Sequence, residues 1–218
     1  MFCKYTAKRL YTELIHLRKS DKKHRIKNTI QMLSNLLKSI TETSSQETLQ
    51  LIINEDNDGV ECVVYADGTQ KRLKTMVFLA DYHIRLQTLH GCDYAVVGMS
   101  TMENIPHGVE LITETLRSQR RKGYNKLMRA IAIVVGFVDE KILYSNTENP
   151  ISAMIQLKSY ICDISFDLKK NQYISHTNIR NEKYIDSIYK DVKIIRLDPH
   201  INIDRSINTI ITWCKSRM

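Results

Sequence analysis

The sequence predicts one mixed α/β domain whose mainly antiparallel sheet is flanked by helices. Its 218 residues are enough for one full-sized domain and few for two. Only 7 glycines and 3 prolines occur, which argues against a many-turned all-β sandwich. Apolar residues recur at three- and four-residue steps near the N-terminus, and the pattern changes to strand-like segments after residue 48. Residues 1–218 are therefore expected to form a single domain without an internal linker.

Two amphipathic helices are expected within residues 1–42. Leu10, Leu14 and Leu17 share one face of a helix over Lys8–Arg18. The basic run Lys19–Arg25 is interpreted as a connection. The second helix carries five apolar residues on one face, namely Ile26, Ile30, Leu33, Leu37 and Ile40. A polar segment, Thr41–Thr48, then separates the helices from the sheet.

Strands are expected in the middle of the chain, over Leu49–Asn54, Val60–Tyr65, Tyr94–Met99 and Val109–Leu116. Turn-like residues follow the first strand at Glu55–Gly59, and Ala66–Thr69 is a second turn signal. The segment Leu73–Ala80 is compatible with a strand or a helix. A loop over Glu103–Gly108 is expected before the last of these strands.

The C-terminal half is expected to alternate between helices and strands. A helix follows Gly123 and runs to about Val135, where Gly136 is a plausible stop. A strand over Lys141–Ser145 precedes a helix capped by Asn149, which ends near Tyr160. The apolar face of that helix is expected to comprise Ile151, Met154, Ile155 and Leu157. The last expected strands are Cys162–Leu168 and Val192–Leu197, and the polar segment Lys169–Asp191 between them has no clear assignment.

Composition narrows the class of protein. No stretch approaches the roughly 20 apolar residues that a membrane span needs, and no signal core follows the N-terminus, so a cytoplasmic protein is expected. The five cysteines are scattered without a CxxC pair, which predicts buried thiols and no metal site. Lys and Arg number 32 against 24 Asp and Glu, a net charge of +8. Such a charge suits a ligand with several phosphates or a polyanion.

The most informative segment is a predicted strand, a short basic loop and a helix start, over residues 109–128. Gly123 permits a tight turn, and consecutive backbone N–H groups at a helix start attract anions. Arg120, Arg121, Lys122 and Lys126 supply countercharge, so a pyrophosphate fits there. A basic helix start on the surface is the competing interpretation. A P-loop is excluded, because the Gly-Lys-Ser/Thr ending is missing.

Two blocks in this region resemble a known family. Residues 120–125, Arg-Arg-Lys-Gly-Tyr-Asn, are similar to the Gln/Arg-x-x-Gly-x-Gly/Ala signature of the GCN5-related N-acetyltransferase (GNAT) superfamily. Residues 149–153, Asn-Pro-Ile-Ser-Ala, are similar to the next conserved block of that family. The resemblance spans Val109 to Phe166, within an expected cofactor-binding core of residues 109–168.

The resemblance implies an N-acetyltransferase in which a primary amine attacks the thioester of acetyl-CoA directly, with no covalent enzyme intermediate and no metal. Acetyl-CoA would lie in a V-shaped gap between the strands Val109–Leu116 and Lys141–Ser145. Backbone groups at Thr113 and Thr115 would pair with the pantetheine amides, as an added strand does. Asn149 and Ser152 would face the pantetheine arm. The residues around the pyrophosphate would be Arg120, Arg121, Lys122, Gly123, Tyr124, Asn125 and Lys126.

Two positions depart from the family pattern. Asn125 stands where the family has its second glycine, and its side chain crowds the pyrophosphate or takes part in binding. Gln156 stands where the family often has the tyrosine that protonates the leaving thiolate. Tyr160, one helical turn later, is the candidate acid, with a buried core tyrosine as the competing interpretation. Glu110 is the candidate base and Glu114 the second choice, unless both simply face water.

Two other functions stay open at this point. A relative that kept the fold and lost catalysis would serve as a structural or partner-binding protein. A nucleic-acid-binding protein would use the basic run Arg18–Lys27, although basic strands interleaved with aromatics are missing. The expected partners are acetyl-CoA and an amine acceptor that the sequence does not specify, and no membrane.

Overall fold

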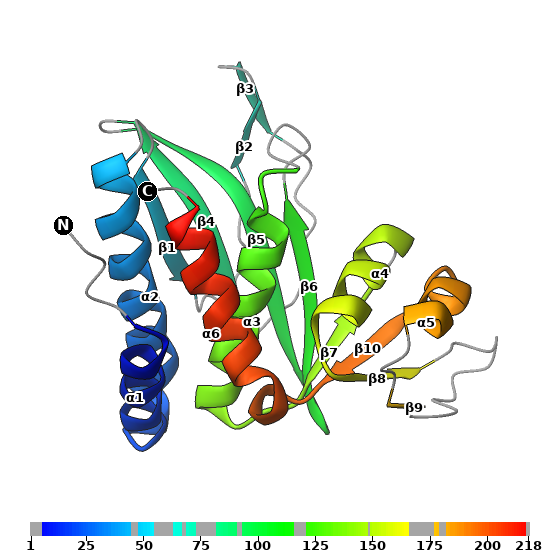
Figure 1. The fold of residues 1–218 in the computed structure, drawn as a ribbon. Coiled ribbons are helices and arrows are strands. Elements are labelled where there is room, and N and C mark those ends of the chain that lie inside the picture. The colour runs from blue at the N-terminus through cyan, green and yellow to red at the C-terminus, as the bar shows by residue number, and fades with distance from the viewer. Residues whose placement is uncertain are drawn as a thin grey trace.

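The computed structural model describes residues 6–44, 48–54, 63–66, 69–72, 82–90, 93–115, 121–147, 149–165, 177–178 and 182–216. These residues form a mixed α/β structure with a mainly antiparallel sheet flanked by helices, as the sequence predicts (Figure 1). None of the described helices is long and apolar enough to cross a membrane. The helices are α1 (Ala7–Arg18), α2 (Lys22–Ser44), α3 (Tyr124–Asp139), α4 (Pro150–Ser159), α5 (Glu182–Ile188) and α6 (Pro199–Lys215).

The described strands form an eight-stranded sheet in the order β1-β4-β5-β6-β7-β10-β8-β9 and a separate hairpin of β2 and β3. Among the strand pairs that the structure describes, β6 and β7 run parallel and the other pairs are antiparallel. The strands are β1 (Thr48–Asn54), β2 (Val63–Ala66), β3 (Thr69–Arg72), β4 (Tyr82–His90), β5 (Asp93–Ile105), β6 (Gly108–Thr115), β7 (Leu143–Asn146), β8 (Cys162–Ser165), β9 (Thr177–Asn178) and β10 (Ile194–Leu197).

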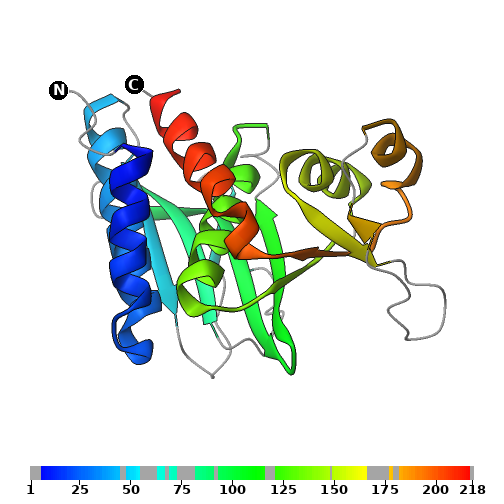
Figure 2. The same ribbon diagram turned by 60° about the horizontal axis from the view of Figure 1, so that its bottom comes forward.

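Four helices, α1, α2, α3 and α6, gather on one face of the sheet (Figures 1 and 2). Alternation along the strands explains this arrangement, because successive side chains point to opposite faces. In β6, Val109 and Leu111 are buried, whereas Glu110 between them is half-buried. In β10, Ile195 and Leu197 are buried in the same way. The apolar face of the sheet and the helical layer enclose the core.

The central helix of this layer, α3, is almost entirely buried, and from Leu127 to Val138 it is apolar except for Arg129. Such a helix must be covered all round, and here α1, α2, α6 and the sheet surround it. The expected stop at Gly136 is wrong, because the helix passes through this residue. A Cβ there would lie 3.0 Å from Pro199 and 3.1 Å from Leu143, so glycine permits close packing. The helix ends instead at Glu140, whose φ is 60°.

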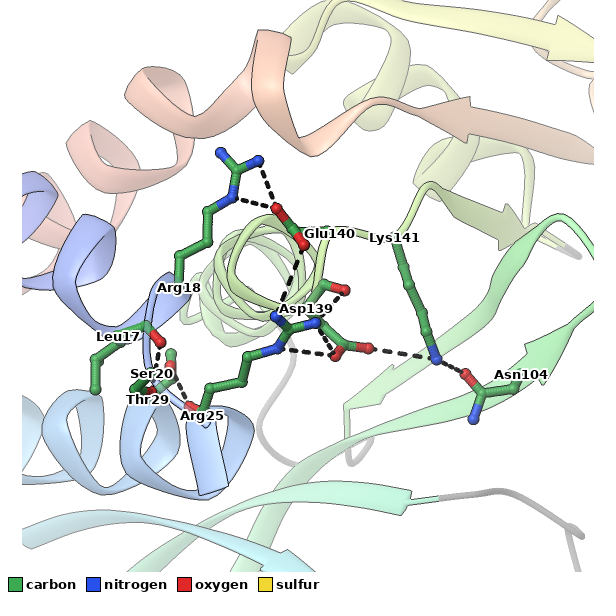
Figure 3. Close-up of polar contacts among 9 residues, drawn as sticks. All are labelled: Leu17, Arg18, Ser20, Arg25, Thr29, Asn104, Asp139, Glu140 and Lys141. Atoms are coloured by element: carbon green, nitrogen blue, oxygen red, sulfur yellow. Dashed lines mark hydrogen bonds and ion pairs between the residues drawn. The ribbon is translucent and has the colours of Figure 1, made fainter. Parts of the chain in front are cut away.

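A network of ion pairs joins the N-terminal helices to the end of α3 (Figure 3). Arg25 is buried and donates to the Asp139 carboxylate at 3.1 Å and to its backbone carbonyl at 2.9 Å. Arg18 donates to Glu140 at 2.7 Å, and Lys141 contacts both Asp139 and Asn104. The helix α2 begins at Lys22 and already includes Arg25. The connection between the two helices is therefore shorter than the expected residues 19–25.

Two further expectations are wrong, and one strand was missed. The expected loop over 103–108 is a tight hairpin in which Ile105 pairs with Gly108. Strand β4 was not predicted, although buried Ile84 and Leu86 alternate with more polar residues. Helix α2 continues to Ser44, into the segment expected to be a polar spacer.

Helix α4 is correctly placed, but its predicted apolar face is wrong. Ile151 and Ile155 are 61% and 45% exposed, whereas Ala153, Gln156 and Leu157 are buried. The C-terminal helix α6 was not predicted either, despite its helical spacing of isoleucines. The expected Leu73–Ala80 and Glu55–Gly59 segments, and about half of Lys169–Asp191, lie outside the described residues. Within the last segment the structure describes β9 and α5.

Candidate functional site

The parallel strands β6 and β7 separate after only three paired positions. Their register joins Val109, Glu110 and Leu111 to residues 143, 144 and 145 of β7. Beyond this point β6 continues to pair with β5 as far as Thr115, whereas β7 stays with β10. The chain after β7 follows β10 as well, because the Thr147 N–H donates to the Lys193 carbonyl at 2.8 Å. Among the described residues, one edge of β6 therefore has no neighbouring strand beyond Leu111.

The backbone groups on that edge can be assigned from a single hydrogen bond. The Val109 N–H donates to the Ile142 carbonyl at 2.8 Å, so the N–H and C=O of Val109 face β7. In a strand these directions repeat every second residue. The N–H and C=O groups of Thr113 and Thr115 consequently face the side that β7 has left. An extended ligand could pair there as an added strand.

The first turn of α3 lies beside this edge and begins without a side-chain cap. Gly123 occupies the N-cap position with a φ of 80°, a left-handed conformation that favours glycine. Arg121 also has a positive φ, 66°, and both residues are exposed together with Lys122 and Lys126. N–H groups at an uncapped helix start form an anion site, and nearby cations strengthen it. Arg120 lies outside the described residues.

Asn125 contacts the free edge of β6. Its side-chain amide donates to the Thr113 carbonyl at 3.4 Å, which joins the first turn of α3 to the strand. Asn125, which departs from the family signature, therefore contacts the Thr113 carbonyl, one of the backbone groups expected to pair with the pantetheine amides.

A pocket with a volume of about 330 Å³ lies between the start of α3 and the end of α6. The wall contributed by α6 was missed from the sequence, together with the helix itself. Tyr124 and Trp213 pack across this junction with ring centroids 5.8 Å apart. The pocket is lined by Gly123, Lys126, Asn208, Thr209, Thr212, Trp213 and Ser216. It adds hydroxyl and amide groups next to the basic loop.

The two residues expected to face the pantetheine arm lie at the start of α4. The Asn149 carboxamide oxygen accepts the Ile151 N–H at 2.9 Å, so this side chain caps the helix. The Ser152 hydroxyl accepts from Arg129 of α3 at 3.3 Å. Ser152 therefore connects the two helices that flank the separating strands.

The two candidate bases differ in their surroundings. Glu110 is half-buried on the face of β6 opposite to Val109, and its carboxylate accepts the Asn146 amide at 3.2 Å. Glu114 is exposed, four residues further along the same face. Glu110 is thus the more constrained carboxylate, held between the diverging strands by a residue of β7.

The candidate acid Tyr160 lies on the helical side of the sheet and is only 3% exposed. Burial raises its pKa from 10.0 to about 12, and the nearby Arg129, Thr209 and Ser206 oppose the rise. Its hydroxyl therefore faces α6 and stays protonated at neutral pH. This environment suits a proton donor and equally a core tyrosine.

The sequence analysis missed Arg129, the cation buried beneath this site. Its side chain is 3% exposed within the apolar α3. Burial lowers its pKa from 12.5 to about 10, with Tyr160 acting in the opposite direction, so it stays charged at neutral pH. A lone arginine in an otherwise apolar helical run was the available signal.

Comparison with family models, with curated proteins and with solved structures found no match to this chain. Among the described residues no group of three His, Cys, Asp or Glu side chains could hold a metal ion. In the basic run that could serve nucleic-acid binding, Arg18 and Arg25 are engaged with Glu140 and Asp139. Two of its charges are thereby neutralised.

Proposed function

We propose that this chain is an acetyl-CoA-dependent N-acetyltransferase with a GNAT-like fold. The separation of β6 from β7 beside the uncapped start of α3 carries the proposal. It combines a strand edge at Thr113 and Thr115, which has no neighbouring strand on that side among the described residues, with a candidate anion site at Gly123. A pantetheine chain ending in a pyrophosphate requires these two features side by side.

The residues at the start of α3 are suited to a pyrophosphate. Gly123 leaves the loop open, since a Cβ there would meet the Trp213 ring at 3.3 Å in an already strained conformation. The N–H groups of the first turn and the exposed cations Arg121, Lys122 and Lys126 would hold the phosphates. Thr113 and Thr115 would orient the arm through their backbone groups.

Acetyl-CoA supplies an acetyl thioester, and the reaction needs two proton transfers from the protein or water. The amine nitrogen attacks the carbonyl carbon, a C–N bond forms, and the C–S bond breaks to leave a thiolate. Glu110 would take the proton that the amine loses, directly or through water, because it is held at the separation point. Tyr160 would return a proton to the thiolate only after its hydroxyl turns from α6.

Calorimetric titration with acetyl-CoA and CoA tests the proposal. We expect micromolar binding by the wild type and loss of binding by Gly123→Glu, which places a carboxylate in the anion site. Ile201→Glu is the matched control, because Ile201 is 54% exposed at the other end of α6. Absence of binding by the folded wild type would refute the proposal.

Turnover separates an active enzyme from a relative without catalysis. We expect Glu110→Gln to bind CoA normally and to lose about 10²-fold or more in kcat, the usual contribution of a general base. A wild type that binds CoA but transfers no acetyl group to any of a broad panel of amines would favour the structural or partner-binding role.

A further inference from the structure

Arg129 is a charged group without a carboxylate partner among the described residues. It is almost fully buried, and the hydrogen bond that the described residues give it is the 3.3 Å contact from Nη2 to the Ser152 hydroxyl. Its Nε is buried and has no hydrogen-bond partner in the described part of the chain. Buried charges are normally paired, because moving one ion from water into the protein interior costs roughly several kcal/mol.

A second polar side chain, on the neighbouring helix α4, is also buried without a hydrogen-bond partner among the described residues. Gln156 is fully buried in α4, and neither its amide nitrogen nor its oxygen has a partner among the described residues. Ser152, Gln156 and Tyr160 follow one another at four-residue steps, so they lie on one side of α4. That side meets Arg129, as the Ser152 contact and the electrostatic effect of Tyr160 on Arg129 both indicate.

The chemistry of the cluster favours an anion with one negative charge. Guanidinium Nε and Nη form a planar pair of donors that matches a carboxylate, and the Gln156 amide adds a further donor. One carboxylate neutralises one guanidinium, whereas a phosphate dianion would leave excess charge in a buried site. Ordered water would satisfy hydrogen bonds but would leave the charge uncompensated.

We infer that Arg129 and Gln156 form an internal carboxylate site, and that the preferred donor is a CoA thioester whose acyl group ends in a carboxylate, such as a succinyl thioester. This inference rests on the CoA site and the acyl transfer of the proposed function, and it replaces the acetyl group by a dicarboxylic acyl group. Ser152 links the two, because it contacts Arg129 and belongs to the helix start expected to face the pantetheine arm.

Titration of the wild type with CoA, acetyl-CoA and succinyl-CoA tests the inference. We expect CoA and acetyl-CoA to bind similarly and succinyl-CoA at least tenfold more tightly. In Arg129→Met the preference for succinyl-CoA should vanish while CoA binding stays unchanged, and Gln156→Leu should reduce the preference. Equal affinities of the wild type for the two thioesters, or a preference that survives in Arg129→Met, would overturn the inference.

Two further measurements keep this test independent of the proposed function. Without ligand, Arg129→Met should unfold at the same or a higher urea concentration than the wild type, since it removes an uncompensated buried charge. Marked destabilisation would mean that Arg129 has structural partners and would overturn the inference. If CoA itself does not bind, the proposed function fails. The carboxylate site is then tested by unfolding in sodium propionate against sodium chloride at equal ionic strength, because propionate carries a single negative charge. Stabilisation of the wild type and not of Arg129→Met would support a carboxylate site, and no stabilisation would refute it.

Discussion

Replacement of Arg25 by methionine should destabilise the fold by about 3 kcal/mol. The side chain of Arg25 crosses from α2 to the end of α3, where it holds both the carboxylate and the backbone carbonyl of Asp139 (Figure 3). Methionine keeps much of the volume and removes the charge and the donors. The Asp139 carboxylate would remain buried after losing its principal cation.

The size of this destabilisation depends on the cation that still contacts Asp139 after the substitution. Removal of one partner from a buried ion pair costs about 3–5 kcal/mol, because the other charge stays uncompensated. The Lys141 ammonium remains 3.3 Å from the second carboxylate oxygen, which places the cost at the low end of that range. For a chain of this length, about 3 kcal/mol corresponds to a fall in Tm of roughly 6–12 °C.

Urea unfolding measures this cost through the fluorescence of Trp213, the single tryptophan of the chain. The matched control is Arg9→Met, because Arg9 forms an exposed ion pair with Glu13 at 3.1 Å. A surface pair of this kind contributes about 0.3–0.5 kcal/mol. Combining Arg25→Met with Asp139→Leu should restore most of the stability, since both charges are then removed. A cost below about 1 kcal/mol for Arg25→Met, close to the control, would refute the assignment of a buried ion pair as a main stabilising contact.

The remaining predictions concern the candidate site. Asn125→Ala should bind CoA several-fold more tightly by calorimetry, because it frees the Thr113 carbonyl. Weaker binding would mean that the Asn125 amide contacts the ligand. Tyr160→Phe should lose a pH dependence of stability: the raised pKa of Tyr160, about 12, contributes stability that is fully present below pH 10 and lost as the pH rises through 12. The wild type should therefore lose about 2 kcal/mol relative to Tyr160→Phe across this interval in urea unfolding, and parallel curves would contradict the burial of the phenol.

Local patterns predicted much of the secondary structure. The steps of three and four residues in α1 and α2 appear as helices because each apolar face is continuous, with Leu10, Leu14 and Leu33 buried. Asn149 caps α4 as predicted, because a side-chain oxygen near a helix start needs only its own neighbours. These features depend on contacts within a few residues.

The candidate site was predictable only in its local part. The basic loop, Gly123 and the start of α3 follow from adjacent residues, whereas the partners of Arg129 and Tyr160 do not. The failure on α4 has the same origin. Sequence periodicity favoured Ile151 and Ile155 as its buried face, but α4 docks through Ala153, Gln156 and Leu157. Which side is covered depends on the elements that α4 meets in the fold, α5 and β10 among them, and both come later in the chain.

The fold class, the positions of most helices and the residues that begin α3 could be predicted from local sequence. The separation of β6 from β7, the place of Gly136 inside a helix and the burial of Arg25 and Arg129 became visible only in the folded protein. The difference lies in how far apart in the chain the interacting residues are. Capping, turns and periodic burial are set by neighbours in the chain, whereas strand separation and the burial of charge depend on segments that meet only in the folded protein.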